Sequence, residues 1–590
     1  LASRKDSPPG SSEQLAGDFY ASCIDDTAAD RAGLTPLAPL LGEIDTARTH
    51  ADVARVIRRL HEVAVSVPFG VTGAYENSEP TVFAANVVAG PLGMGDRDAY
   101  LKPEPRFAKI RDDYRAHVMR MLKLAGMPEA RTREAADGVL ALEKRFAEAS
   151  LDAKTAADAA ATEHKTTFAQ LKELAPRVDW EKYFDEAKLP PAAVNVAEPK
   201  LLQQVDAELQ NTPVPVWKAY LEFHLLESAS PFLSKAFADE SLGFKDRLTG
   251  GASSKQPRTE RCAEITEALL GEPVGREYAE RYFPPAAKAK VQEIARNLVS
   301  TLKDAVSSAA WMGAETKGKA LEKVAGLRLQ FGYPDQWKDY GAVTIRRDQL
   351  WANVAQARRF LVEDTRKAIG KPTDRSAWAF PPSSPDAYLD PQLNELVLPA
   401  GFLQPPAFDP AASDAVNYGA IGAGLMHDLT HSVDATGAEL DAQGRAHGWW
   451  TEDDRRAFEK RASCVVDQYD AYTIEPGVHL QGKLVRNEAI GDLAGLHLAF
   501  AALEKSMETK PVPVLGGFTP QQQFFLSWGQ YRGEAMRLDA QRDRVKEDPH
   551  PTPQFRVIGP VSSLPEFQQA FACKAGDPMV RSPSMRCSVW

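Results

Sequence analysis

The chain has 590 residues, of which 44% are hydrophobic and 26% are charged, a composition typical of a globular protein large enough for two or more cores. Its formal net charge of −11 and pI near 5.6 argue against nucleic acid and against anionic membrane surfaces as partners, since both attract basic proteins. No run of about 18 apolar residues could span a bilayer, and the start at Leu1 without a signal-peptide pattern indicates a processed or truncated N-terminus.

The first half of the chain has the pattern of amphipathic helices. Residues 1–17 contain the segment PPGSS and are expected to form a flexible lead-in. From about Asp18 to Leu327, apolar residues recur every three or four positions, as in ADVARVIRRLHEVAVSV, and charged residues fill the other face. This pattern predicts one large helical lobe whose charged runs face solvent.

The composition changes at FGYPDQW (331–337) and again over residues 379–408, where prolines become frequent. Within the second segment, NELVLPA has the composition of a short strand, and the prolines around it should confine it to an edge or to loops. We place a domain boundary between 335 and 380 and divide the chain into a lead-in, a helical lobe and a second domain, over residues 1–17, 18–340 and 341–590. In the last of these, helix is predicted from about Asp414 and again after DATGAELDAQGRAHG.

Two histidines lie four residues apart in GLMHDLTHSVD. On a helix, His427 and His431 would point the same way and could share one Zn²⁺. A pair of this kind is also common on helix surfaces and in cores, so the spacing alone leaves both interpretations open.

A second helical segment, RNEAIGDLAGLHLAF, places Glu488 and Asp492 four residues apart. Glu488 could complete a His₂Glu zinc site with an open fourth position, and Asp492 could accept the other ring N–H of a ligating histidine. Alone, the pair could equally be two exposed acids on a helix.

Cysteines are few, and no CxxC pair is present. Spacing cannot reveal pairing, so reduced buried thiols and disulfides are both possible for the five cysteines, Cys23, Cys262, Cys464, Cys573 and Cys587.

The histidine motif HDLTH and the acidic motif EAIGD together resemble those of the neprilysin and endothelin-converting-enzyme family of zinc metallopeptidases. The hallmark of that family is HExxH followed by ExxxD. The resemblance covers nearly the whole chain, in the ordered blocks FYASCIDD, PLGMGDRDAYL, HLLESASPFLSK, RYFPPAAKAK, FGYPDQW, DAYLDPQLNELVLPAGFLQPP, WWT, SCVVDQY, PHPTPQFRVIG and CSVW. It implies a mainly α, two-lobed fold, in which a helical cap and a thermolysin-like α+β catalytic domain enclose a central cavity.

By the same resemblance, one Zn²⁺ per chain is bound by His427, His431 and Glu488. Asp492 matches the acid that orients the first histidine, and Asp434 matches a second acid behind the ligands. These assignments are carried over position by position.

The base is where the chain departs from the family. Asp428 replaces the glutamate that takes a proton from the attacking water and returns it to the leaving amine. The shorter side chain withdraws the carboxylate by roughly 1.5 Å, about one C–C bond, and a positioned base contributes about 10²–10⁴-fold to the rate. Zinc binding does not depend on this residue, so we expect it to persist even if turnover is slow.

Substrate contacts are also implied by the resemblance. His550 matches a donor to the developing oxyanion, and Arg556 matches the arginine that grips a substrate carbonyl, although the segment alone would suggest a loop histidine and a surface arginine. Asp386 and Ala387 match the residues that bind the substrate backbone. The family has asparagine at position 386, whereas an ionised aspartate only accepts hydrogen bonds.

The matching blocks pair Cys23 with Cys262 and Cys464 with Cys587. Cys573 is left over, because its family partner lies in an N-terminal block that would precede residue 1, together with a strand of the catalytic domain. We expect either a fragment of a longer protein or a rebuilt domain. Two disulfides imply an oxidising compartment, so the protein is expected to be secreted or periplasmic, or anchored through an N-terminal segment absent here.

The family resemblance predicts a zinc endopeptidase that cleaves oligopeptides on the amino side of hydrophobic residues, with activity reduced by Asp428. The alternative is a non-catalytic zinc-binding relative that serves as a peptide-binding or scaffold protein, which Asp428 and Asp386 favour. The retained ligands, Asp492, His550 and Arg556 favour the enzyme.

Overall fold

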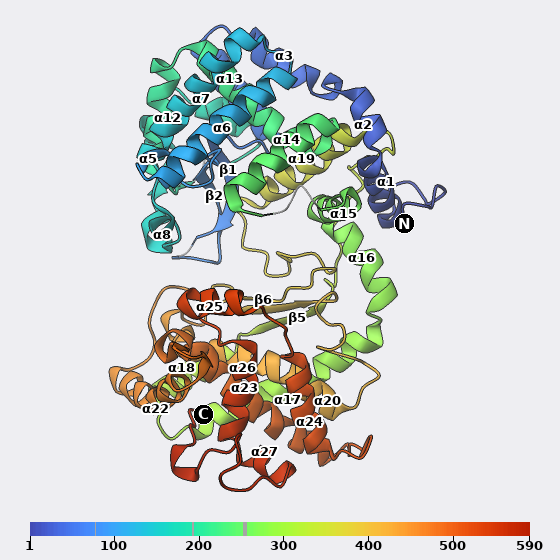
Figure 1. Ribbon diagram of the computed structural model, residues 1–590, viewed down its shortest axis with the longest axis vertical. Coiled ribbons are helices and arrows are strands. Elements are labelled where there is room, and N and C mark those ends of the chain that lie inside the picture. The colour runs from blue at the N-terminus through green and yellow to red at the C-terminus, as the bar shows by residue number, and fades with distance from the viewer. Residues whose placement is uncertain (77, 191–193, 252–255) are drawn as a thin grey trace. The chain divides into compact units, whose positions relative to one another are not determined.

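Figure 1 shows a computed structural model of the chain, which describes residues 1–76, 78–190, 194–251 and 256–590. No helix in these ranges is both long and apolar enough to cross a membrane. Two compact units, each assembled from two segments, make up the chain: Leu1–Val274 with Trp337–Arg375, and Gly275–Gln336 with Ser376–Trp590.

The first unit consists mainly of helices around one hydrophobic core. Its helices are α1 (Ser12–Ile24), α2 (Asp26–Ala32), α3 (Ala38–Thr46), α4 (His50–His61), α5 (Asp98–Leu101), α6 (Pro105–Leu124), α7 (Glu129–Ala149), α8 (Ala153–Ala156), α9 (Ala159–Thr162), α10 (Phe168–Leu174), α11 (Trp180–Glu186), α12 (Pro199–Asn211), α13 (Val214–Ala229), α14 (Lys235–Thr249), α15 (Arg258–Leu269) and α19 (Leu350–Ala368). The helix α16 (Gly271–Tyr282) runs from the first unit into the second.

This unit also contains a sheet that the helical pattern did not predict. Its strands are β1 (Phe69–Tyr75), β2 (Phe83–Ala89), β3 (Lys165–Thr166) and β4 (Val194–Val196), in the order β1-β2-β4-β3. The hairpin β1–β2 is antiparallel, and β4 pairs with β2 in parallel. Short strands with many alanines and glycines carry a weak β signal, which explains why the prediction of an all-helical lobe was incomplete.

The second unit combines helices with a small sheet. Its helices are α17 (Pro285–Ser308), α18 (Ala314–Ala325), α20 (Asp414–Asn417), α21 (Ala423–His431), α22 (Glu452–Asp470), α23 (Gly482–Met507), α24 (Pro520–Tyr531), α25 (Leu538–Glu547), α26 (Pro553–Ser563) and α27 (Pro565–Ala570). Its strands are β5 (Arg328–Gly332), β6 (Tyr388–Asp390), β7 (Glu395–Pro399), β8 (Thr473–Glu475) and β9 (Val478–His479).

The strand predicted in NELVLPA forms, but the prediction of an edge position was wrong. β7 lies in the middle of the sheet β5-β7-β6, parallel to β5 and antiparallel to β6, and all five of its residues are buried. The prolines do not interfere because Pro399 is the last residue of the strand and needs no further ladder bond.

The division into units differs from the single predicted boundary. Helices α17 and α18 lie before residue 340, yet they pack in the second unit, where Figure 1 shows green segments among orange and red ones. One cause is Asp454 at the start of α22, whose carboxylate accepts hydrogen bonds from Gly313 N–H (2.8 Å) and Thr316 Oγ1 (2.5 Å) at the start of α18. Helix α19 returns to the first core through Trp351 and Val354. The composition of the sequence does not indicate that α17 and α18 belong to the second unit, or that α19 belongs to the first.

Both disulfides that the resemblance implied are present. Cys23 bonds Cys262 within the first unit, and Cys464 bonds Cys587 within the second. Cys573 is free and half-buried, as predicted.

Candidate metal centre

Two helices of the second unit carry the predicted zinc ligands. The helix predicted from Asp414 forms as α20, a π-helical turn over Tyr418–Gly422 and α21, which ends at His431. Helix α21 packs closely on α23. A Cβ at Gly495 of α23 would lie only 2.7 Å from the carbonyl oxygen of Ala423 and 2.8 Å from the backbone nitrogen of His427. The absence of a side chain there lets the two helices bring their polar residues together.

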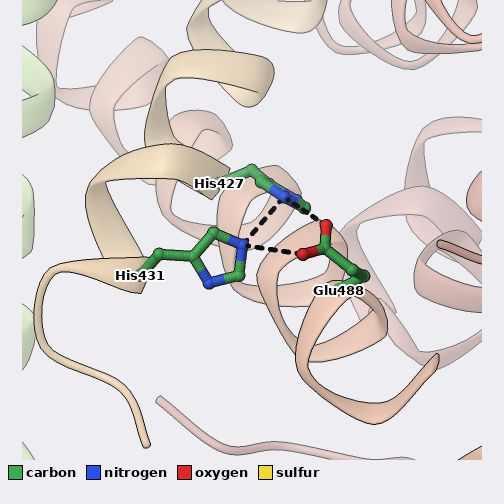
Figure 2. A group of neighbouring side chains, drawn as sticks. All are labelled: His427, His431 and Glu488. Atoms are coloured by element: carbon green, nitrogen blue, oxygen red, sulfur yellow. Dashed lines mark hydrogen bonds and ion pairs between the residues drawn. The ribbon is translucent and has the colours of Figure 1, made fainter. Parts of the chain in front are cut away.

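His427, His431 and Glu488 converge on one point (Figure 2). The Nε2 atoms of the two histidines are 3.1 Å apart, and the Glu488 oxygens lie 3.1 Å from His427 Nε2 and 3.6 Å from His431 Nε2. All three side chains are largely shielded from solvent, with exposed fractions of 5%, 13% and 16%.

The far nitrogen of each imidazole faces a buried carboxylate. His431 Nδ1 lies 2.7 Å from Asp434 Oδ2 in a hydrogen bond, and His427 Nδ1 lies 2.9 Å from Asp492 Oδ1 without hydrogen-bond alignment. We therefore assign the ring protons to Nδ1. Each Nε2 then presents a lone pair to the common point.

This donor set fits a zinc ion. Three lone-pair donors facing one another repel unless a cation lies between them, and two neutral imidazoles with one carboxylate form a ligand set typical of catalytic zinc. Tetrahedral zinc with bonds of about 2.0–2.1 Å separates its ligand atoms by about 3.3 Å, close to the separations found here.

Two arginines hold the acid behind His427. Arg556 donates from Nε to Asp492 Oδ2 and from Nη2 to Oδ1, each at 2.7 Å, and Arg532 donates from Nη2 to Oδ1 at 3.2 Å. Burial alone would favour a protonated acid, but the charges of Arg556 and Arg532 hold the pKa of Asp492 well below its ordinary value. Asp492 is therefore a carboxylate although it is 0% exposed.

His550 lies beside the same group. Its Nε2 is 3.0 Å from a Glu488 oxygen, and its Nδ1 is 2.8 Å from Asp548 Oδ1. The hydrogen bond to Glu488, followed by that to Asp548, raises the pKa of the imidazole. Burial opposes ionisation of Glu488, yet the neighbouring imidazoles of His427, His431 and His550 lower the pKa of its carboxyl well below its ordinary value.

Asp428 follows His427 directly on α21 and is half-buried. Tyr531, the last residue of α24, lies near it: burial, and to a lesser extent the charge of Asp428, raise the pKa of the Tyr531 hydroxyl against the charge of Arg532. The hydroxyl of Tyr531 is thus neutral, and it lies near Asp428 of α21.

The residues expected to bind substrate are placed differently from one another. Arg556 lies near the metal group but spends two of its nitrogens on Asp492. Asp386 and Ala387 lie just before β6, where the Asp386 N–H donates to Ser384 Oγ at 3.1 Å. Among the residues that the structure describes, no hydrogen bond or ion pair joins Asp386 or Ala387 to the metal group.

Sequence reasoning missed two residues of this site. Asp548 sits two positions before His550, and the DPH spacing could have suggested an acid that orients the ring. Arg532 reaches Asp492 while its guanidinium stacks on the rings of Trp528 and Tyr531, at 4.7 and 4.9 Å. No local pattern marks Arg532, because its partner lies 40 residues away.

Comparison with protein families gives two consecutive matches. The model for the N-terminal part of peptidase family M13 matches residues 1–334, and the second model for peptidase family M13 matches residues 386–587. Together they cover most of the chain, including every residue of the metal group.

Among known proteins, endothelin-converting enzyme 1 of Mus musculus is 28% identical over 607 residues, which cover 98% of this chain and 78% of the relative. Among solved structures, zinc metalloprotease Zmp1 of Mycobacterium tuberculosis in its open state is 32% identical with a TM-score of 0.93, covering 100% of this chain and 92% of that chain. The inhibitor complex of the same metalloprotease gives a TM-score of 0.80, with coverage of 100% and 90%.

Proposed function

The chain belongs to peptidase family M13, and from this premise we propose that it is a zinc-dependent endopeptidase that hydrolyses oligopeptides on the amino side of hydrophobic residues. Family membership supports peptidase activity and a zinc ion. The oligopeptide substrates and the preference for hydrophobic residues are carried over from the family resemblance.

One observation carries the proposal: the Nε2 atoms of two imidazoles and one carboxylate meet, and a buried acid backs each imidazole. His427, His431 and Glu488 are the proposed ligands of a single Zn²⁺. A site with three protein ligands leaves the fourth position to water or substrate, as catalytic zinc requires.

Zinc bound there would polarise the substrate carbonyl and make the attacking water more acidic. In the proposed reaction, Asp428 accepts a proton from that water and delivers it to the leaving amine. His550, whose pKa is raised by Glu488 and Asp548, holds an N–H for the oxyanion that develops on the substrate. Asp434 and Asp492 keep the ligating imidazoles in orientation.

For substrate binding, Arg556 retains its second terminal nitrogen, Nη1, after its two bonds to Asp492, and this N–H group is the proposed donor to a backbone carbonyl. Asp386 and Ala387 are the proposed contacts to the substrate backbone. An ionised Asp386 accepts hydrogen bonds only, so it favours a substrate N–H at this point and disfavours a carbonyl.

The rival function is a zinc-binding relative without catalysis. It is favoured by the two departures from the family, Asp428 and Asp386. The complete set around the metal group, including Asp434, Asp492 and His550, favours the enzyme, since a site that no longer catalyses would be expected to lose some of these residues.

Metal analysis combined with cleavage of a peptide library tests the choice, using the wild type, Glu488→Gln and, as a matched control on the same helix, the exposed Glu504→Gln. We expect one Zn²⁺ per chain and cleavage before hydrophobic residues in the wild type and the control, and loss of both in Glu488→Gln. Bound zinc without cleavage by the wild type would support the rival. A wild type that binds no zinc would overturn both functions.

The two disulfides support a location in an oxidising compartment, and we assign the protein to the secreted or periplasmic space.

A further inference from the structure

A buried lysine lies behind the second histidine. Lys323, in the last turn of α18, is 1% exposed, and its Nζ donates hydrogen bonds to the carbonyl oxygens of Gly437 (2.6 Å) and Leu440 (2.7 Å). In the described part of the chain it forms no ion pair. Burial lowers its pKa to about 8, against the opposing charges of Asp434 and Asp441. Because an unpaired buried cation is costly, its position needs an explanation.

The carbonyls that Lys323 binds belong to one tight turn, residues 436–440, which contains the single 3₁₀ turn Gly437–Glu439. The indole N–H of Trp449 also donates to the Gly437 and Leu440 carbonyls, at 2.9 and 3.0 Å. Lys323 and Trp449 thus hold the same two oxygens from different elements.

The turn lies directly against the backbone of His431. A Cβ at Gly437 would lie 2.2 Å from the Ser432 oxygen and 2.4 Å from the His431 oxygen, so only glycine fits. A displacement of this turn toward α21 would therefore push on the end of that helix.

The same turn supplies the donors that fix Asp434. The N–H groups of Thr436 and Gly437 donate to Asp434 Oδ1 at 2.8 and 3.2 Å, and Oδ2 faces His431 Nδ1. A continuous series of hydrogen bonds thus runs from Lys323 through Gly437 and Asp434 to the imidazole of His431.

We propose that Lys323 is a positioning residue of the metal centre: it fixes the turn 436–440, and through Asp434 it fixes the orientation of the His431 imidazole. This inference rests on the zinc site of the proposed function. A residue that only attaches α18 to its unit would affect stability without changing zinc affinity.

The test compares the wild type with Lys323→Met, which keeps the length of the side chain and removes its charge and donors. Lys290→Met is the matched control, since Lys290 on α17 likewise donates to two backbone carbonyls, those of Pro410 (3.2 Å) and Ala412 (2.9 Å), away from the metal group. The readouts are the zinc dissociation constant, from competition with a chelator, and amide hydrogen exchange of residues 434–440 in the zinc-free proteins.

We expect Lys323→Met to remain folded, because an apolar side chain replaces a buried cation, and to bind zinc on the order of tenfold more weakly, the lower end of the effect of groups behind metal ligands. Its 434–440 amides should exchange faster than in the wild type. Lys290→Met should change neither quantity. If Lys323→Met does not fold, Trp449→Phe removes the other donor to the same carbonyls and is expected to give the same two changes.

Unchanged zinc affinity and unchanged exchange in a folded Lys323→Met, or in Trp449→Phe if Lys323→Met does not fold, would overturn the inference. If the wild type itself binds no zinc, the proposed function fails, and the exchange comparison still decides whether Lys323 orders the turn.

Discussion

In the proposed reaction, Asp428 is the base, and the reach of its carboxylate is expected to limit the rate. Asp and Glu have similar intrinsic pKa values, about 3.9 and 4.3, so the substitution changes mainly the reach of the carboxylate. Proton transfer requires a heavy-atom distance of about 2.6–3.2 Å. A withdrawal of roughly one C–C bond is therefore large enough to decide whether the base contacts the water directly.

Restoring the longer side chain should raise the rate. We expect Asp428→Glu to increase peptide hydrolysis by up to about 10²-fold, within the range that a positioned base supplies, and Asp428→Ala to abolish the remaining hydrolysis. Zinc content should stay at the wild-type level in both variants, because Asp428 is not among the proposed ligands. The measurement is kcat/KM on several hydrophobic peptides, with zinc determined in the same samples.

Equal or slower hydrolysis by Asp428→Glu would show that the site has adapted to aspartate. Asp386→Asn would then be the next variant to assay, since it restores an amide that donates as well as accepts.

The sequence predicts site residues that belong to the two helical motifs, but not residues whose partners lie far away in the sequence. Helical spacing puts His427 with His431, and Glu488 with Asp492, on one helix face, and the family resemblance predicts that the two pairs form one site. The structure brings all four residues together. Arg532 was missed because its contact with Asp492 depends on how α24 packs near α23.

Among the elements, the contact between α21 and α23 carries the metal group. Gly495→Ala would insert a methyl group within 3.0 Å of three backbone atoms of the facing helix. We expect it to lower the free energy of unfolding by about 1–3 kcal/mol, the usual effect of overpacking, and to weaken zinc binding. Urea denaturation and chelator competition measure the two effects.

Gly529→Ala on α24 is the control, because a Cβ there meets no atom within 4 Å. It should be neutral or stabilising by about 0.5–1 kcal/mol, the difference in helix propensity. A Gly495→Ala variant as stable as this control would contradict the close packing of the two helices.

In the first unit, a buried histidine joins three helices. His117 on α6 is 0% exposed and lies 3.1 Å from a Glu227 oxygen on α13 and 2.9 Å from a Glu240 oxygen on α14. Burial opposes its protonation, but the hydrogen bonds to Glu227 and Glu240 outweigh burial and raise its pKa. The same contacts lower the pKa of both carboxyls.

This pKa predicts a direction for stability against pH. A group whose pKa is higher in the folded state stabilises fully below its unfolded pKa, about 6.5, and loses that contribution as pH rises through the folded value. The stability advantage of wild type over His117→Gln should therefore shrink as the pH rises above about 6.5. Urea denaturation across this range tests it, with the exposed His164→Gln as a control for the loss of a histidine. A constant difference for His117→Gln would contradict the prediction.

The sequence predicts the type of an element where its hydrophobic pattern is long, but it does not predict the position of a strand within its sheet. The helices around the two motifs formed as predicted, since their periodicity is strong. The prolines around β7 predict an edge strand or loops, but its partner β5 lies more than 60 residues earlier, and pairing over that distance leaves no local signal.

The residues that the structure describes form two hydrophobic cores, and each unit has its own disulfide. Cys464 and Cys587 are separated by 123 residues, and closing a loop of this size is worth about 4–5 kcal/mol in the chain-entropy model. We expect Cys587→Ser to lower the free energy of unfolding by about 2–5 kcal/mol and Cys573→Ser to leave it unchanged. Urea denaturation measures both.

Mass spectrometry of a non-reduced digest should recover the same two pairs, with Cys573 as a free thiol. Recovery of different pairs would contradict the structure, and recovery of no disulfide would also remove the support for an oxidising compartment.

The zinc dependence of hydrolysis is tested by titrating the zinc-free wild type with Zn²⁺ while the hydrolysis of a hydrophobic peptide is followed. A zinc peptidase with one site should gain activity in proportion to added zinc and reach a plateau at one Zn²⁺ per chain, whereas Glu488→Gln should show no gain at that ratio. Tight binding of one Zn²⁺ with no hydrolysis, or hydrolysis that does not depend on zinc, would contradict the account.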